Sequence, residues 1–517
     1  MQPRISPRYR RRWAWGKVLP RGLLLLAFIW LFIGSGQLRA RYVATSPEGS
    51  VRLLENPIRP QTLRDGLKAG SKLGGNGEQA WRSAVRSAFS PDLLAGNVSD
   101  GYWHEYLTVS MTHVLTEIRK SGRIIQCNYD PALSSLPTDS KRIFIASNLH
   151  NNEEIMPNFI TQLVQFLLAF PERRFFVSIY ESGSTDRTGE WLELLKEVLS
   201  ELKVSNRIVA NGGDLRKEGQ GRIEFLAGVR NRALEPLYDA EEGIWDKIVF
   251  INDVLFCSQD IIRLMQHDGD AVCGLDFIRT DLAAYPRDML QDIMLLDLTD
   301  RFFFPETVAR EISHNKWMLK RWKNSLGRRD AIKSDKPLVF YDIWVSHDLG
   351  GSQLDNFPPY IKNDTYSADR LRRGLPFQAQ CCWNGMVVLN AKPFHEGLKF
   401  RAHLPNECAT SECVLMCHDF ARMGYKSVLI DPGVRSAYTF EDAMDLYSTR
   451  MVEQIPVTSW GDVLASEKLE LVEVPENTKN FQCCPLREGM ELVDWKDCFW
   501  YDIGATNYTM QSASISR

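Results

Sequence analysis

From Lys141 onward, short apolar segments alternate with amphipathic segments of helical period, and this alternation limits the fold more than any other feature of the sequence. The apolar segments are expected to form buried strands at 143–146, 175–180, 208–210, 247–251 and 270–275. The segments between them repeat apolar residues every three to four positions, which predicts helices at 157–167, 188–202, 222–238 and 259–267. Strands and helices in this order predict an α/β fold with a mostly parallel sheet covered by helices on both faces.

The second half of the chain is less regular. Residues 276–375 are aromatic and basic in places without a clean period, and we expect loops there that bind an acceptor. Order returns with a strand at 386–389 and a last strand at 428–430. Between them, Ser411 is expected to cap a helix that ends before Gly424.

Three turns are expected to form the functional site, because ligands bind beyond the carboxyl ends of the strands in sheets of this kind. They are residues 147–154, which begin at Ser147, and residues 181–188 and 252–257. In the second turn, Gly-Ser-Thr lets backbone N–H groups approach a ligand, and Glu181 and Asp186 can accept hydrogen bonds from a ribose or a base. The alternative is an ordinary strand-to-helix turn capped by Asp186 or Thr188.

The segment F-I-N-D-V (250–254) places Asn252 and Asp253 at the end of an apolar strand. A carboxylate that opens into a cleft there can hold Mn²⁺ or Mg²⁺, which prefer oxygen ligands and would neutralise a diphosphate leaving group. The alternative is an Asx-turn or a helix cap. On the helix that precedes this strand, Arg230 and Arg232 could reach phosphates, although arginines on a helix are more often surface residues.

The segment S-E-C-V-L-M-C-H-D (411–419) is the fourth candidate. Glu412 lies at a helix N-terminus, where the helix dipole favours its ionised form, and it could face an anomeric carbon or an acceptor hydroxyl. His418 is a candidate second metal ligand beside Asp253. Cys408, Cys413 and Cys417 also permit a zinc site with His418, but their spacing is not that of a standard zinc finger. Motifs of serine hydrolases, P-loop proteins, zinc proteases and kinases are absent from the sequence.

The N-terminus predicts a membrane anchor. Residues 1–21 hold seven basic and no acidic residues, and the uncharged apolar residues 22–38 would span roughly 25 Å as a helix. The positive-inside rule then places the N-terminus in the cytosol and the rest in a lumen, although a cleaved signal peptide is the alternative. Residues 39–139 are expected to be a stem, 140–447 the catalytic domain and 448–517 a tail.

Charge, sequons and cysteines agree with a lumenal enzyme. The net charge of the chain is −3, so the body without the basic N-terminus is mildly acidic, which argues against a general nucleic-acid binder. Three N-glycosylation sequons begin at Asn97, Asn363 and Asn507. Eleven cysteines permit disulfides in an oxidising lumen, and their odd number leaves at least one without an intramolecular partner.

Taken together, these residues resemble the cryptococcal mannosyltransferase family of fungi, the capsule-associated α-1,3-mannosyltransferases. The resemblance covers about residues 143–447 and is carried by I-A-S-N-L-H-N-N-E (145–153), Y-E-S-G-S-T-D (180–186), F-I-N-D-V, F-Y-D-I-W-V (340–345), C-C-W-N-G (381–385) and S-E-C-V-L-M-C-H-D. It implies a GT-A type nucleotide-sugar-binding fold, a single-pass type II Golgi membrane protein, and transfer of mannose from GDP-mannose to a mannoside with Mn²⁺ or Mg²⁺.

The resemblance also implies residue roles. Asn252-Asp253-Val254 would stand where GT-A enzymes carry Asp-x-Asp, with Asn in place of the first Asp. Ser147, Glu181, Asp186, Arg230 and Asn252 would then bind the nucleotide sugar. From the segments 340–345 and 381–385, Asp342, Trp383 and Asn384 are expected to bind the acceptor.

The reaction itself leaves routes open. An α-mannoside formed from an α-linked donor retains the anomeric configuration. The acceptor can attack on the face that the leaving group departs from, with the donor phosphate taking the proton, or Glu412 can act as a base or a transient nucleophile. A different nucleotide-sugar donor, or a non-catalytic Golgi factor for polysaccharide export or assembly, are the alternative functions. The presence of both Asp253 and Glu412 favours an enzyme.

Overall fold

A computed structural model of the protein describes residues 76–94, 107–279 and 338–503, apart from short gaps at 214–215, 218, 240–242, 450–454, 467, 470–479, 487–492 and 494–497. The expected cytosolic tail and anchor, and the sequons at Asn97 and Asn507, lie outside these residues. In the part of the chain that is described, no helix is both long and apolar enough to cross a bilayer.

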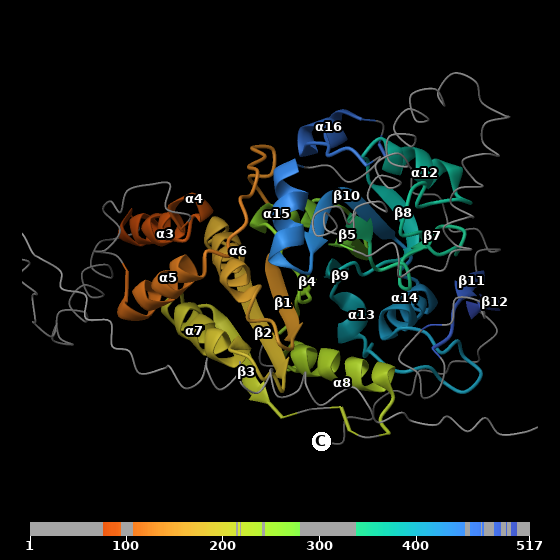
Figure 1. Ribbon diagram of the computed structural model, residues 1–517, viewed down its shortest axis with the longest axis horizontal. Coiled ribbons are helices and arrows are strands. Elements are labelled where there is room, and N and C mark those ends of the chain that lie inside the picture. Colours follow the sequence, from red (N-terminus) through yellow and green to blue (C-terminus); the bar gives the residue numbers. More distant parts are fainter. Residues whose placement is uncertain are drawn as a thin grey trace, which may run out of the picture. The chain divides into compact units, whose positions relative to one another are not determined.

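A ten-stranded sheet forms the centre of the described fold (Figure 1). Nine strands lie in the order β3-β2-β1-β4-β9-β5-β10-β8-β7, and β6 pairs with β5. Their bounds are β1 Arg142–Leu149, β2 Arg174–Ser182, β3 Ser205–Gly212, β4 Lys247–Ile251, β5 Ala271–Arg279, β6 Leu338–Phe340, β7 His347–Asp348, β8 Phe377–Cys381, β9 Met386–Asn390 and β10 Val428–Ala437.

Most of the predicted strand directions are confirmed. β1 runs parallel to β2 and β4, and β2 runs parallel to β3. β9 lies antiparallel between β4 and β5, so β4 and β5 point the same way, and β5 is parallel to β10. The carboxyl ends of six strands therefore lie along one edge of the sheet, and β9 begins at that edge.

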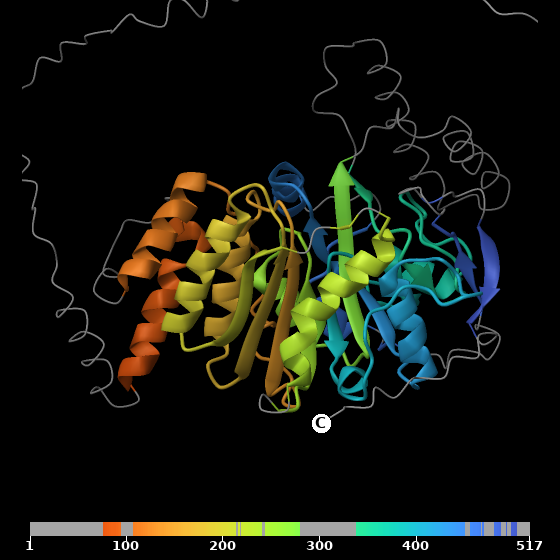
Figure 2. The ribbon, with the colours of Figure 1, turned by 90° about the horizontal axis from the view of Figure 1, so that it is seen from below.

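Helices cover both faces of the sheet (Figure 2). Their bounds are α6 Met156–Ala169, α7 Thr188–Glu201, α8 Arg222–Leu234, η2 Glu235–Tyr238, α9 Ser258–Met265, α12 Thr365–Arg372, α13 Lys392–His395, α14 Glu412–Arg422, α15 Phe440–Thr449 and α16 Trp460–Ala465. α6 packs with α7 and α9, whereas α8 packs on β1, β2 and α14. The helix predicted over 222–238 divides in two, because Pro236 has no N–H to continue the α-helical ladder.

The expected stem boundary at residue 139 needs correction. α3 (Asn76–Ala88), α4 (Pro91–Leu94) and α5 (Val109–Ser121) contribute buried apolar side chains to the same core as the sheet. α3 packs on α6, and α5 packs on α6 and α7 (Figure 1). α6 is buried around its whole circumference, so it needs this cover on the face away from the sheet. The folded body thus extends to at least residue 76.

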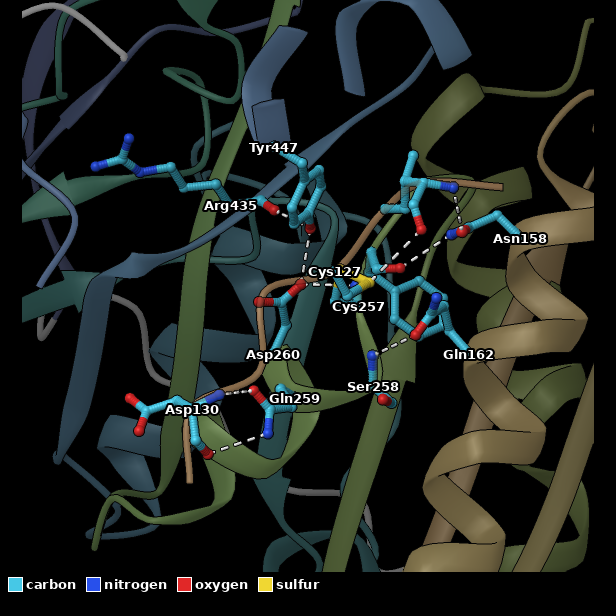
Figure 3. The surroundings of a disulfide bond; sticks show 12 residues. Cys127, Asp130, Asn158, Gln162, Cys257, Ser258, Gln259, Asp260, Arg435 and Tyr447 are labelled. Carbon is cyan, nitrogen blue, oxygen red and sulfur yellow. Dashed lines mark hydrogen bonds between the residues drawn. A yellow bond between two sulfur atoms is a disulfide. The ribbon is translucent and has the colours of Figure 1, made fainter. Parts of the chain in front are cut away.

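A disulfide ties the segment after α5 to the start of α9. Cys127 and Cys257 are bonded, and Figure 3 shows the hydrogen bonds around this link. The Gln259 side chain accepts from the Asp130 amide at 2.6 Å and donates to the Asp130 carbonyl at 3.1 Å. Tyr447 donates to the Asp260 carboxylate at 2.7 Å, which brings α15 to the same place. The link closes a loop of 130 residues and fixes the N-terminal helices to the sheet.

The C-terminal segment is also joined to the body. β11 (Asn480–Cys483) and β12 (Phe499–Asp502) form a two-stranded sheet, and disulfides join Cys408 to Cys483 and Cys484 to Cys498. Residues 448–517 are therefore not simply a tail. Two further disulfides, Cys273–Cys382 and Cys381–Cys417, leave Cys413 as the single free cysteine, buried in α14. The alternative zinc site is excluded, because Cys408 and Cys417 are both bonded to other cysteines.

Candidate active site

The turns that follow β1 and β2 are held together by hydrogen bonds at the carboxyl edge. The Asn151 amide donates to the Ser184 hydroxyl at 2.8 Å, and the Thr185 amide donates to the Asn151 side chain at 2.8 Å. The Glu153 amide donates to Asp186 at 2.9 Å. The two turns predicted from the sequence therefore form one surface, on which His150 and Asn151 are exposed.

Asp186 and Glu181 use their oxygens within the protein. Asp186 accepts from the amide of Thr188 at 3.0 Å and from its hydroxyl at 2.5 Å. Burial opposes ionisation of Asp186, but the hydrogen bonds from Thr188 and from the Glu153 amide hold its pKa below the ordinary value. Glu181 is fully buried and accepts from the Ser184 amide. The geometry at Asp186 agrees with the alternative of a capped turn.

Ser147 lies inside β1 rather than on the turn. Its side chain is fully buried, and its hydroxyl makes no hydrogen bond within the described structure. The residues that reach the edge are the next ones along the chain, which the sequence reasoning included in the turn without singling out. His150 Nδ1 lies 2.7 Å from the Ser182 carbonyl; because that oxygen can only accept, Nδ1 carries the proton. The Nε2 atom of His150 is then an acceptor.

Arg230, Glu412 and Asn252 meet across three separate elements. Arg230 on α8 donates through Nε to Glu412 at 2.9 Å and through Nη1 to Asn252 at 3.1 Å. The Asn252 amide donates to the Gly385 carbonyl at 2.8 Å, which joins the end of β4 to the turn before β9. Only 11% of the Arg230 side chain and 2% of the Glu412 side chain are exposed. The residues are 182 positions apart in the sequence, so this ion pair connects the two halves of the fold.

Three aromatic rings surround the Arg230 guanidinium. Its central carbon lies 4.4 Å from the ring centre of Trp383, 5.3 Å from that of Phe250 and 5.7 Å from that of Phe400. Such faces stabilise a cation that has lost its water. Trp383 was expected to bind the acceptor, but its side chain is 1% exposed and encloses Arg230. Arg232, two residues further along α8, is half-exposed and forms an ion pair with Glu235, as surface arginines commonly do.

The N-terminus of α14 holds Glu412 in place. Ser411 caps the helix, and its hydroxyl accepts from the Cys413 amide at 3.2 Å. That hydroxyl also lies 3.3 Å from Glu412 Oε2, while Oε1 faces Arg230. Glu412 therefore contacts a cation at one oxygen and a hydroxyl at the other. The predicted helix, cap and position of Glu412 are confirmed.

Asp253 is a partly buried carboxyl next to this cluster. Burial raises its pKa, while Arg230, a hydrogen bond from Asn152 and His150 oppose the rise. A carboxylate with this balance suits a cation, because a divalent ion would stabilise its ionised form. Asn252 is a less suitable cation ligand, since its side-chain oxygen already accepts a hydrogen bond from Arg230. Within the described residues, no group of three or more His, Cys, Asp or Glu is arranged to hold a metal ion.

His418 does not join Asp253 in the structure. Its ring packs against Phe481 of β11 with centres 4.3 Å apart, and its charged neighbours are Arg401 and Arg422. Burial lowers the pKa of His418 well below its ordinary value, with those two cations acting in the same direction. None of these partners is a partner of Asp253. The geometry therefore does not support the expected metal site shared by Asp253 and His418.

Asp342 and Asn384 lie on the other side of the cluster. The Asn384 amide donates to Asp342 at 3.3 Å, and the Asn384 side chain accepts from Ser346 at 2.6 Å and donates to the Gly274 carbonyl at 2.8 Å. Burial raises the pKa of Asp342 to about 6; Arg230 lowers it and Glu412 raises it. Arg230 and Glu412 thus both act electrostatically on Asp342, so Asp342 belongs to the same group of charged residues as the ion pair.

Asp276, on β5, is a site residue that the sequence reasoning missed. It is fully buried; it accepts from the Tyr438 hydroxyl at 2.5 Å and from the Asp342 amide at 3.2 Å. Burial and the neighbouring Asp342 carboxyl raise the pKa of Asp276 well above its ordinary value. The signal was weak, because Asp276 follows the apolar strand predicted over 270–275 in a segment without a clear period.

Asn363 lies apart from these residues and is exposed, and its side-chain amide donates to Ser352 at 2.8 Å. The sequon is therefore on the surface, as glycosylation requires. Whether it carries a glycan stays a prediction.

The sequence matches a known protein family. The family described as Cryptococcal mannosyltransferase 1 matches residues 142–419, more than half of the chain. A curated relative, Alpha-1,3-mannosyltransferase CMT1 of Cryptococcus neoformans var. neoformans serotype D, is 25% identical over 391 residues, which are 69% of this chain and 72% of the relative. The family match spans every strand from β1 to β9 and reaches the end of the Glu412 segment.

Two solved structures share a distant likeness. The mannosyltransferase PcManGT from Pyrobaculum calidifontis, in complex with GDP-Man and Mn²⁺, has a TM-score of 0.29 at 11% identity, over 67% of this chain and 68% of its own. TarS of S. aureus has a TM-score of 0.27 at 11% identity, over 61% of this chain and 41% of its own. Neither likeness is close enough to add to the argument. On the sequence match alone, the chain belongs to the cryptococcal mannosyltransferase 1 family of glycosyltransferases.

Proposed function

We propose that this protein transfers mannose from GDP-mannose to an α-mannoside acceptor in an α-1,3 linkage, with the help of Mn²⁺ or Mg²⁺. The observation that carries the proposal is the buried chain Glu412–Arg230–Asn252, which lies beside Asp253 at the carboxyl edge of the sheet. The family supplies the reaction class, and the curated relative is named for α-1,3-mannosyl transfer. The strand order, with antiparallel β9 between parallel strands, supports a GT-A type fold.

The parts of the site have distinct proposed roles. The surface formed by the turns after β1 and β2, on which His150 and Asn151 are exposed, is the proposed nucleotide side. Asp253 is the residue that would hold the metal ion, which when bound supplies positive charge to a diphosphate leaving group. Asp342 and Asn384 form the proposed acceptor side.

Glu412 is the proposed catalytic carboxylate. Arg230 donates to it and it lies at the α14 N-terminus, in a place where only 2% of its side chain is exposed. An ionised carboxylate with little solvent is suited to stabilise a developing positive charge on a sugar ring, to accept a proton from a hydroxyl, or to bond transiently to the anomeric carbon. In each case Arg230 is a positioning residue, because its hydrogen bonds fix Glu412 and Asn252 relative to each other.

We also propose that the protein is a single-pass type II Golgi membrane protein with a lumenal catalytic domain. The five disulfides among the described cysteines support this, since disulfides persist in the oxidising secretory compartments. The apolar residues 22–38 after a basic N-terminus support an anchor. A fluorescent fusion scored against Golgi and endoplasmic reticulum markers, together with protease protection of the C-terminus, tests the location and the orientation.

Activity is tested with the full-length protein in detergent and a panel of nucleotide sugars, with Mn²⁺ and with EDTA. We expect metal-dependent release of GDP from GDP-mannose that increases when an α-mannoside is added. Turnover of another nucleotide sugar would replace the donor and keep the enzyme class. Lack of turnover by folded protein with every donor and acceptor would favour a non-catalytic factor for polysaccharide export or assembly.

A further inference from the structure

An exposed aromatic ring stands at the edge of the candidate site. Tyr341, directly after β6, has 47% of its surface exposed. It packs edge to face on Tyr438, which follows β10, with ring centres 4.9 Å apart and planes at 64°. A tyrosine that keeps this much ring in solvent beside buried charged groups has an unused apolar face. Tyrosine combines an apolar ring with a polar hydroxyl, and it is therefore common in binding sites.

Asp276 fixes both tyrosines with respect to the site. Its Oδ2 accepts from the Tyr438 hydroxyl at 2.5 Å, and its Oδ1 accepts from the Asp342 amide at 3.2 Å. Its backbone carbonyl accepts from the Tyr341 amide at 3.0 Å. One fully buried residue on β5 thus holds the Tyr438 hydroxyl and the backbone of Tyr341 and Asp342. The Tyr341 ring itself packs against the Tyr438 ring that Asp276 fixes.

Polar groups beside the rings have spare hydrogen-bonding capacity. Asp342 is partly exposed, so its carboxyl can accept further hydrogen bonds at the surface. Ser436 is paired in register with Asp276 on the neighbouring strand, so both side chains lie on the same face of the sheet. The Ser436 hydroxyl is 2% exposed, makes no hydrogen bond, and lies 3.0 Å from the place that a Cβ on Gly385 would occupy.

The rings follow strands that lie beyond β9 in the sheet order, and the segment after Tyr438 reaches the first turn, where the Phe440 amide donates to Glu154 at 3.2 Å. Asp253 interacts electrostatically with both tyrosines and with His150. His150 belongs to the turn after β1, whereas the tyrosines follow β6 and β10, which lie beyond β9 in the sheet order. The rings are therefore a candidate surface for the second substrate of a two-substrate enzyme. Trp383 does not serve there, because only 1% of it is exposed.

We propose that Tyr341 and Tyr438 form a stacking platform for the pyranose ring of the acceptor, with Asp342 as the residue that accepts hydrogen bonds from its hydroxyls and Asp276 as the residue that positions all three. The proposal rests on the proposed function, since it assumes a sugar acceptor. A pyranose offers one face of C–H bonds and a rim of hydroxyls, which matches an aromatic face bordered by a carboxylate. Arg230 and Glu412 interact electrostatically with Asp342, so a sugar bound here lies next to the proposed catalytic carboxylate.

The test separates acceptor from donor. In full-length protein we expect Tyr341→Ala to raise the acceptor KM, measured with α-1,3-mannobiose, about five- to tenfold, with the GDP-mannose KM unchanged within twofold. Tyr341→Phe keeps the ring and should behave as wild type. Tyr366→Ala is the matched control, because Tyr366 on α12 is 42% exposed and has no contact with the site. An unchanged acceptor KM in Tyr341→Ala, or a raised donor KM instead, would overturn the platform.

A positioning role for Asp276 has its own readout. Tyr438→Phe removes the hydroxyl-to-carboxylate bond, and Asp276→Asn leaves one acceptor oxygen for two donors, the Tyr438 hydroxyl and the Asp342 amide; both changes keep the shapes of the side chains. Both should raise the acceptor KM without lowering affinity for GDP, measured by calorimetry. A fall in GDP affinity in either variant would show a general disturbance and contradict the role.

A binding measurement tests the platform without depending on turnover. Calorimetric titration of wild type with α-1,3-mannobiose in the presence of GDP should give a saturable heat that Tyr341→Ala weakens. If no donor is turned over but this heat is present and sensitive to Tyr341, the proposed function fails and the platform stands. If GDP-mannose is turned over in the presence of an acceptor and the heat does not depend on Tyr341, the platform fails alone.

Discussion

The ion pair between Arg230 and Glu412 predicts a strongly non-additive response to mutation. Truncating Arg230 to Met removes two hydrogen bonds of 2.9 and 3.1 Å and leaves Glu412 buried with only 2% of its side chain exposed. Loss of one partner of a buried pair destabilises a protein by about 3–5 kcal/mol, because the other charge remains without compensation. The three aromatic rings around Arg230 add to the loss, since Met retains packing but not charge.

The double variant Arg230→Met/Glu412→Gln should recover much of this stability. Without Arg230, an amide at position 412 costs much less to bury than a carboxylate, so the pair of changes should cost about 2 kcal/mol or more less than the sum of the singles. Urea unfolding of wild type, both single variants and the double variant, with the disulfides intact, gives the coupling free energy. The Arg232→Met change, at a surface pair with Glu235, is the control and should cost less than about 1 kcal/mol. Additive single effects at Arg230 and Glu412 would refute the reasoning.

Three further predictions address catalysis, pH and covalent structure. Asp253→Ala should abolish transfer while leaving a folded protein, because Asp253 is only partly buried and burial disfavours its charged form; full activity of this variant, with normal metal dependence, would remove it from the site. The folded-state pKa of Asp342 is about 6, above its unfolded value, so wild type should lose stability as pH rises from about 4 to 6. This loss should be on the order of 1–2 kcal/mol larger than in Asp342→Asn. Equal slopes of the two proteins in pH-dependent urea unfolding would contradict the prediction. Replacing Cys127 and Cys257 together by Ser should lower the free energy of unfolding by about 2–5 kcal/mol, and a change below about 1 kcal/mol in denaturant unfolding would show that the N-terminal helices are held by packing alone.

The local parts of the fold were predictable from the sequence. The strands ending at Ile251 and Ser182, the helix capped by Ser411 and the turn at Asn252-Asp253 each depend on neighbouring residues, so period and capping chemistry suffice to find them. The antiparallel direction of β9 was not predicted, because it depends on pairing with strands that lie more than a hundred residues away in the sequence.

The assembly of the site was predictable only in part. Arg230 and Glu412 were both singled out, but their mutual contact depends on how α8 and α14 pack, which no local pattern records. The roles of Trp383 and His418 differ from expectation for the same reason, since burial decides them and burial is a property of the whole fold. In the N-terminal region, polar and glycine-rich composition masked the apolar residues Trp81, Val85 and Phe89, which recur every four positions along α3 and its end.

Two adjacent cysteines connect maturation of the protein to the order in which its active site is put together. Cys381 bonds to α14 and Cys382 bonds to β5, immediately before the turn that carries Trp383 and Asn384. The free Cys413 stands one helical turn before Cys417, so the oxidising machinery must choose between two thiols on one helix. A link to Cys413 instead would draw α14 along its axis and carry Glu412 away from Arg230. Correct pairing of these cysteines should therefore be required for activity, and protein made in a reducing cytosol should be inactive even where its helices and strands have formed.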